Sequence, residues 1–188
     1  MNSIALAVLS GFFLNLPLHF GIGVSDIYAE REARFLNYVL KALILFFTLL
    51  LQWLLFALVF SPMMLGFFKY FLLLPVGAFF PLCLRFILQK IFPKLLKKED
   101  VFVFSYGSGA SIAACLIMLS IAGSLAEALV IASGFSGGTL FSMLLLRSIL
   151  FRVEREKVTS LIRGFPLMLI AMGILALALS AAAIMYLQ

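Results

Sequence analysis

The chain alternates between long apolar runs and short polar or charged links. Six runs are about 20 residues or longer, the length that an α-helix needs to cross a ~30 Å hydrocarbon core. They fall near residues 3–24, 35–60, 63–91, 101–123, 125–150 and 162–187. The pattern predicts an all-α integral membrane protein with six transmembrane helices, in a single membrane domain that covers residues 1–188.

Composition supports this fold class, because 65% of the 188 residues are apolar and only 12% are charged. Such values lie outside the range of soluble domains. Apolar runs recur to the last residue, so we expect the first run to be a retained helix and not a signal peptide. Cys83 and Cys115 both lie in apolar runs, which offers neither a disulfide framework nor a metal-ligand spacing.

The cationic residues predict the orientation of the chain. Links after the first, third and fifth runs are rich in Lys and Arg, whereas the links after the second and fourth runs are short and nearly free of them. By the positive-inside rule, the charged links are cytoplasmic and both termini face the other side of the inner (cytoplasmic) membrane. The net charge of +6 therefore reports topology and does not indicate a nucleic-acid partner.

Six crossings divide into two halves of three helices, and an odd number per half inverts one half relative to the other. The predicted inverted repeats are approximately 1–95 and 96–188, with the first and fourth helices in equivalent places. Both helices carry polar, Gly-rich interruptions, "NLPLHFGIG" and "FSYGSGASIAAC". Interrupted helices at membrane depth survive only where protein or a cavity covers them. The residues expected to break these helices are Pro17, Gly21, Gly23, Gly107 and Gly109.

Asn15, His19 and Ser108 are the candidates for a central polar site between the two interruptions. Asn15 and His19 are four residues apart and share a helix face, so two interpretations stay open. They belong to a functional site, or they satisfy each other or a backbone carbonyl. The Gly and Ser residues of the fourth run are equally consistent with close helix packing. No catalytic residue and no metal site is predicted, since a lone His is not a metal site.

Glu127 is the one acidic residue inside the last five apolar runs. A proton relay through His19 would need such a carboxylate. The alternative places Glu127 in the link between the fourth and fifth helices, where it has no part in proton transfer.

Several stretches together resemble a known family. "NLPLHFGIGVS" at 15–25, "SGFSGG" at 133–138, an Arg-rich link and "VTSLIRGFPLMLIAMGILALAL" at 158–179 are similar to the RnfA/RnfE and NqrD/NqrE membrane subunits of Rnf/Nqr ion-translocating oxidoreductases. The most specific parts are Gly134-Phe135-Ser136 and Arg163-Gly164. The resemblance covers nearly the whole chain, and the outward N-terminus resembles the RnfA/NqrE type.

The resemblance implies a membrane subunit that pairs with a homologous subunit and works with flavin or iron–sulfur redox subunits. It implies at most a subunit of a translocase, not a complete enzyme. In the family, cysteines of the first and fourth helices hold a [2Fe-2S] cluster shared between the paired subunits. Matching Asn15 to the family Asn places Ser25 and Ser111 at these ligand positions, where a hydroxyl is a hard, scarcely ionised ligand. Cys115, one turn after Ser111, is either a weak substitute or an inert buried thiol.

Two functional hypotheses follow. The first is a divergent Rnf/Nqr-type subunit with a structural or ion-path role, which binds no cofactor by itself. The second is a stand-alone small membrane transporter or scaffold that reuses the fold, because interrupted helices that meet at the membrane midplane suit a solute or ion equally well.

Overall fold

The computed structural model describes residues 3–8, 10–11, 14–15, 35–60, scattered positions between 71 and 90, 109–155 and 165–187. Nearly all of these residues are helical, which confirms the all-α part of the predicted fold. The helices are α1 (Ser3–Val8), α4 (Phe35–Leu55) with its π-helical continuation η2 (Phe56–Phe60), α6 (Gly109–Ile121), α7 (Leu125–Arg155) and α8 (Phe165–Leu187).

The observed boundaries follow the hydrophobic pattern closely where the two can be compared. α4 and η2 together cover the predicted range 35–60, and α7 begins at Leu125 as expected. α7 continues to Arg155, beyond the predicted end at 150, because a helix does not have to stop where the hydrocarbon does. The predicted helix at 63–91 falls largely outside the described residues. Six helices and an inverted repeat therefore stay predictions.

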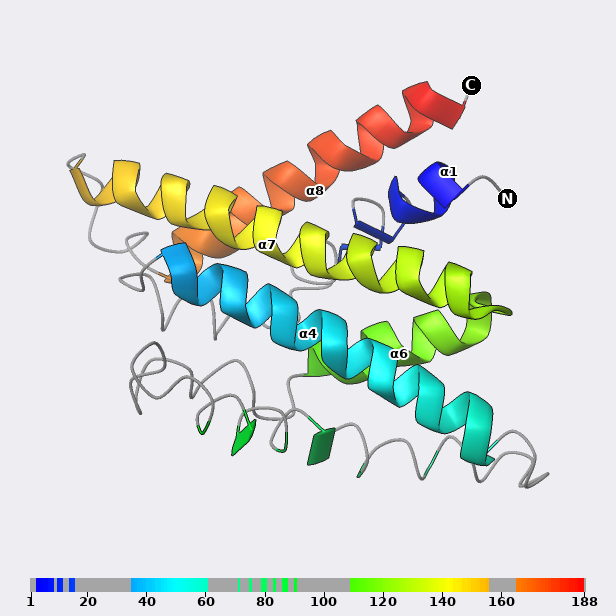
Figure 1. Cartoon of the computed structure of the whole chain (residues 1–188). Coiled ribbons are helices and arrows are strands. Elements are labelled where there is room, and N and C mark those ends of the chain that lie inside the picture. Colours follow the sequence, from blue (N-terminus) through cyan, green and yellow to red (C-terminus); the bar gives the residue numbers. More distant parts are fainter. Residues whose placement is uncertain are drawn as a thin grey trace.

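α7 is the central element of the described structure, because it contacts α1, α4, α6 and α8. Figure 1 shows α4 running alongside α7 in the opposite direction, while α6 leads into α7 through a tight turn. α8 starts near the C-terminal end of α7 and diverges from it. The last turns of α8 and the short α1 lie toward the same end of the bundle.

Two groups of buried apolar side chains hold these helices together. The larger group joins α1, α4, α6 and α7, and includes Leu6, Leu49, Met118 and Phe135. The smaller group joins the start of α4 to α7 and α8. It consists of Tyr38, Met143, Leu146, Met168 and Met172. α8 is therefore attached through Met168 and Met172, and its partly buried Leu175 and Leu179 pack against the same group.

Polar side chains are buried in this bundle, while many large apolar side chains are exposed. Leu58 is 70% exposed and Leu177 is 74% exposed. The buried polar side chains are Ser10, Asn15, Lys41, Thr48, Gln52, Ser111, Thr139 and Ser142. In water, this exterior would be a large exposed apolar patch of a kind that soluble proteins rarely have. The segments Tyr38–Val59 and Leu125–Ile149 are long and apolar enough to cross a membrane.

The turn between α6 and α7 is closed by a capping box. The backbone N–H of Glu127 donates to Ser124 Oγ at 3.3 Å, and Glu127 Oε2 accepts a hydrogen bond from the Gly123 N–H at 2.9 Å. The first contact satisfies an N–H group that the start of α7 leaves without a helical partner. The second differs from a standard capping box, because Glu127 bonds the N–H of Gly123, one residue before the cap. The interpretation of Glu127 as a residue of the link is therefore the one that the structure supports.

We expect Ser124→Ala to lower the free energy of unfolding by about 1 kcal/mol, because it removes the cap of the central helix. Ser120→Ala is the matched control, since the exposed Ser120 hydroxyl only donates back to Ile117 O within α6 at 2.7 Å. Reversible unfolding in mixed SDS and mild-detergent micelles measures both. Equal stability of the two variants would contradict the capping role.

Candidate functional site

The first segment crosses α7 at very close range. Regular α-helix ends at Val8, Ser10 and Gly11 continue in π-helical form, and Asn15 is no longer helical. A Cβ atom on Gly11 would lie 2.9 Å from Gly134 O. One on Gly134 would collide with Ser10 Oγ, and one on Gly138 with Gly11 O. The two backbones meet so closely because none of these three glycines has a side chain.

Gly134 and Gly138 are four residues apart and therefore form a GxxxG pair on one face of α7. In membranes, where lipid is as apolar as a leucine side chain, such small-residue faces allow helices to gain packing contacts that bulky residues would prevent. Ser10 adds to the fit without needing a partner on α7, since its hydroxyl donates to Leu6 O at 2.9 Å. The crossing is thus formed by backbone against backbone.

Asn15 completes the crossing with a buried set of hydrogen bonds. Its Nδ2 donates to Gly11 O at 3.1 Å and to Gly138 O at 3.0 Å. Ser142 Oγ lies 2.9 Å from Asn15 Oδ1 and 2.8 Å from Gly138 O, and its single proton serves one of them at a time. Asn15 is 2% exposed and Ser142 is fully buried. Both Nδ2 and Oδ1 of Asn15 therefore lie within hydrogen-bond distance of a partner.

This arrangement explains how the first segment leaves the helical conformation inside an apolar bundle. Gly11 O is the carbonyl that the backbone N–H of Asn15 would bond in a continuous α-helix. Here the side chain of Asn15 satisfies that carbonyl and also reaches across to α7. Of the two interpretations of Asn15, the structure supports the bond to backbone carbonyls. Chemically, the site is a tether, because its donors and acceptors are already matched to one another.

Among the other predicted site residues, three lie in α6. Gly109 is the first described residue of α6. Ser111 follows in the first turn and is 4% exposed, and Cys115 is completely buried. The remaining predicted residues lie outside the described residues: Pro17, His19, Gly21, Gly23, Ser25, Gly107 and Ser108.

The residues described in α6 do not fit an iron–sulfur cluster. A cluster requires thiolate ligands. Ser111 offers a hydroxyl, and Cys115 packs in the larger apolar group beside Leu6 and Met118. Within the described part of the chain, no group of three or more His, Cys, Asp and Glu side chains is placed to hold a metal ion. Cys115 therefore acts as a small apolar packing residue.

Ser142 and the glycine pair are the functional residues that we did not select from the sequence as a site. The sequence does contain a pattern that indicates this packing face. Gly134 and Gly138 have GxxxG spacing, and Ser142 lies one turn further along the same face. The sequence did not show that Gly11 and Asn15 would be the partners of this face. We expected the first segment to meet the fourth, whereas the described polar contacts join it to the fifth.

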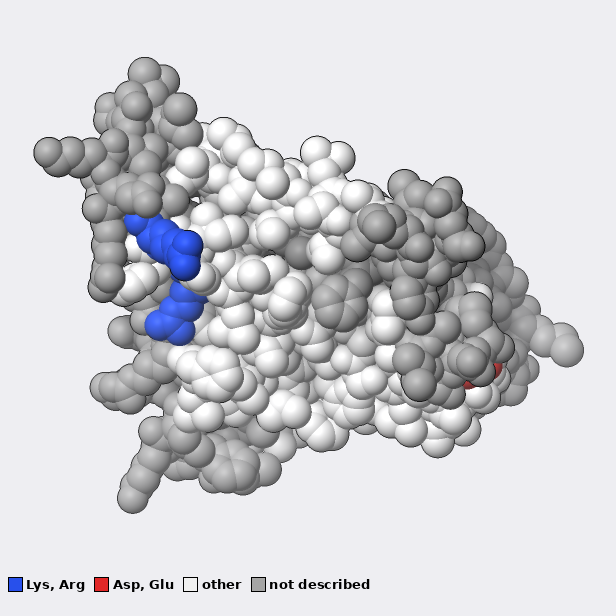
Figure 2. Space-filling view, turned by 90° about the horizontal axis from the view of Figure 1, so that it is seen from above, with Lys and Arg blue, Asp and Glu red and all other residues white. Residues whose placement is uncertain are grey.

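A cationic end of the bundle lies apart from this tether. The guanidinium of Arg147 sits over the Tyr38 ring, 5.4 Å from its centroid, and thereby links α7 to the start of α4. On the face shown in Figure 2, the visible Lys and Arg side chains lie at one end of the molecule, and the visible acidic side chain lies at the opposite end. Charge is thus separated along the axis of α7.

No protein-family model matches the chain, and no curated protein matches it. The resemblance to the Rnf/Nqr subunits therefore rests on the sequence motifs alone. In the structure, two of these motifs meet, because Asn15 opens "NLPLHFGIGVS" and bonds to Gly138, which closes "SGFSGG".

We expect Gly138→Ala to destabilise the protein, although Ala favours helix by ~1 kcal/mol over Gly. Its methyl group would collide with the Gly11 backbone, and overpacking costs about 1–3 kcal/mol. Gly137→Ala is a closely matched control on the same turn, because nothing lies within 4 Å of its added Cβ. Thermal unfolding in detergent should separate the two variants in opposite directions. A Gly138→Ala protein as stable as Gly137→Ala would refute the close crossing.

We expect Asn15→Leu and Ser142→Ala to be non-additive, because they remove two ends of one hydrogen bond. A double-mutant cycle should give a coupling of about 0.6 kcal/mol, the typical value for interhelical hydrogen bonds in membrane proteins. Asn15→Leu paired with Ser180→Ala serves as the control cycle, since among the described residues the Ser180 hydroxyl donates to Ala176 O within α8. Zero coupling in the first cycle would exclude the contact between Asn15 and Ser142.

Proposed function

We propose that the chain is a multi-pass protein of the inner (cytoplasmic) membrane, with both termini on the non-cytoplasmic side. The apolar exterior, the buried polar side chains and the two membrane-length helices support the membrane placement. Separation of charge supports the orientation, since the cationic end carries the start of α4 and the end of α7. α1 and the end of α8 lie toward the other end.

Within that membrane, we infer that the chain is a divergent subunit of an Rnf/Nqr-type ion-translocating electron-transport complex, paired with a homologous subunit. The single observation that carries this proposal is the contact between Asn15 and Gly138, because it joins the two motifs on which the resemblance depends. Residues 123 positions apart in the chain are brought together at a sealed crossing. The two motifs are then parts of one structural arrangement, and this supports the proposal that they belong together.

The role that we propose is architectural, with no complete redox centre on this chain. Serine at 111 and a fully packed Cys115 support this restriction, because a cluster needs thiolates that can reach it. The Asn15 tether would hold the interrupted first segment in place, so that a partner subunit meets a defined surface.

Affinity purification of the full-length tagged chain from its native membranes tests this proposal. We expect a homologous six-helix subunit, together with flavin and iron–sulfur subunits, to co-purify with the wild type and with Gly137→Ala. Asn15→Leu and Gly138→Ala should lose these partners, because the tether that shapes the subunit is broken. Mass spectrometry of the eluate and its flavin absorbance measure the outcome.

Cys115→Ser decides between the architectural role and a redox role. We expect iron and acid-labile sulfide in the purified complex to stay unchanged in this variant. Loss of both, with the subunits still associated, would contradict the architectural version and make Cys115 a ligand. If the protein is stable and homogeneous but no redox subunit co-purifies with it, the result would favour the stand-alone transporter or scaffold.

A further inference from the structure

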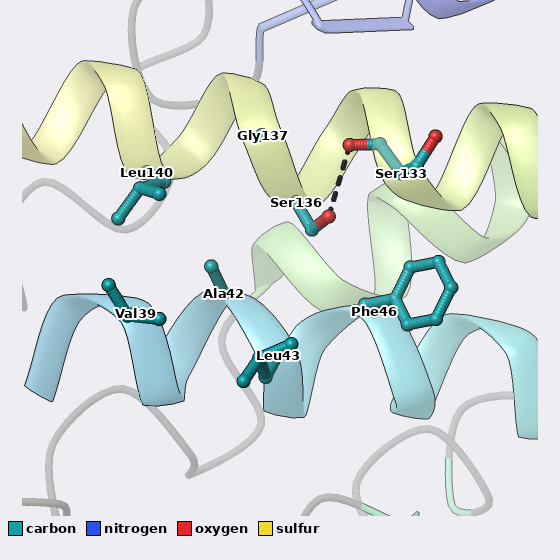
Figure 3. Close-up of a pocket in the computed structure, with 8 residues that line it drawn as sticks. All are labelled: Val39, Ala42, Leu43, Phe46, Ser133, Ser136, Gly137 and Leu140. Carbon is teal, nitrogen blue, oxygen red and sulfur yellow. Dashed lines mark hydrogen bonds between the residues drawn. The ribbon is translucent and has the colours of Figure 1, made fainter. Parts of the chain in front are cut away.

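A groove of about 310 Å³ runs between α4 and α7, on a different face of α7 from the tether. Leu43 and Phe46 border it on α4, and Gly137 and Leu140 border it on α7. Figure 3 shows these side chains on the two facing helices, with Ala42 between them. A Cβ on Gly137 would meet nothing within 4 Å, so the groove is open where Gly138, its neighbour, is tightly covered.

The two serines of the groove do not demand a polar occupant. Ser133 Oγ donates to Val130 O at 2.7 Å, and Ser136 Oγ donates to Ser133 O at 3.1 Å (Figure 3). Both hydroxyl protons are therefore used within α7. Most of the remaining lining is hydrocarbon, which can be covered by an apolar chain without leaving a donor unpaired.

The size of the groove favours a narrow occupant. From Ser133 to Leu140, α7 rises about 10.5 Å, so the groove is short. Its volume of about 310 Å³ lies at the lower end of small-molecule sites, which are about 300–1,000 Å³.

The cationic end supplies the charge complementarity for a particular ligand. Positions 133, 137, 140, 144 and 147 recur at helical spacing, so Arg147 follows the groove along the same stripe of α7. Arg147 lies about 10.5 Å beyond Leu140 along α7. This distance is within the ~15 Å thickness of one leaflet. The guanidinium lies over the Tyr38 ring, 5.4 Å from its centroid, and the N–H donors of a guanidinium suit a phosphate oxygen.

We propose that this groove binds one acyl chain of an anionic phospholipid of the cytoplasmic leaflet, whose headgroup phosphate is held by Arg147. The site fixes a lipid between α4 and α7 at the end where these helices start and finish. It rests on the membrane placement proposed above, and not on the Rnf/Nqr assignment. Carbonate extraction of the membranes tests that placement separately, since a protein released by carbonate is not an integral one.

Photo-crosslinking of the purified full-length chain tests the site. The probe is phosphatidylglycerol with a diazirine at the end of one acyl chain, presented in phosphatidylcholine vesicles that contain the protein. We expect adducts concentrated at 39–46 and 133–140, and competition by unlabelled phosphatidylglycerol but not by added phosphatidylcholine. If the adducts of the wild-type protein are spread evenly over all exposed apolar faces, that result alone overturns the proposal.

Variants then distinguish the site of the lipid acyl chain from the site of the lipid headgroup. Gly137→Leu should reduce the groove adducts at least fivefold, because its side chain fills the groove. Gly173→Leu should not, although Gly173 in α8 also has nothing within 4 Å of an added Cβ. Arg147→Gln should reduce the preference for phosphatidylglycerol about fivefold, the factor expected for one cationic side chain near an anionic surface, whereas Arg147→Lys should keep it.

Circular dichroism and elution volume confirm that each variant is folded. Undiminished adducts in Gly137→Leu would overturn the groove as the site of the acyl chain. Absence of lipid adducts at 133–140, together with the elution volume of a dimer that Gly137→Leu converts to a monomer, would instead assign the groove to a second copy of the protein.

Discussion

The described structure depends on one constraint, the near-contact of two backbones where Gly11 meets Gly134 and Gly138. Only glycine leaves room for this approach, and only a matched set of hydrogen bonds makes it tolerable in an apolar bundle. Asn15 supplies those bonds to Gly11 O and Gly138 O. Because α7 also contacts α4, α6 and α8, a shift of the first segment on α7 would be felt throughout the bundle.

The two faces of α7 show how adjacent residues acquire different roles. Gly138 is buried against the first segment, whereas Gly137 opens on the groove that faces α4. A rotation of 100° per residue is enough to place one glycine in the protein contact and its neighbour beside the groove. One short sequence, "SGFSGG", therefore serves both the proposed architectural role of the chain and the proposed lipid site.

Sequence patterns predicted some of the helices and the site only in part. The range of α4 with η2 and the start of α7 follow from runs of apolar residues, whereas the cap formed by Ser124 and Glu127 was not predicted. Asn15 stood out because an amide is costly in hydrocarbon unless it is paired. Its partner was not predictable, since i,i+4 spacing suggested His19 while the observed partner Ser142 is 127 residues away.

What the sequence by itself determined is the alternation of apolar helical runs and charged links, from which the membrane class and the orientation are predicted. The length of each apolar run and the positions of Lys and Arg between the runs are local properties. They can therefore be read directly along the chain. The tertiary structure decided which polar groups meet, which glycine is covered and that Cys115 lies in an apolar group of side chains. These features depend on contacts between helices distant in sequence, and such contacts arise only when helix faces pack against one another.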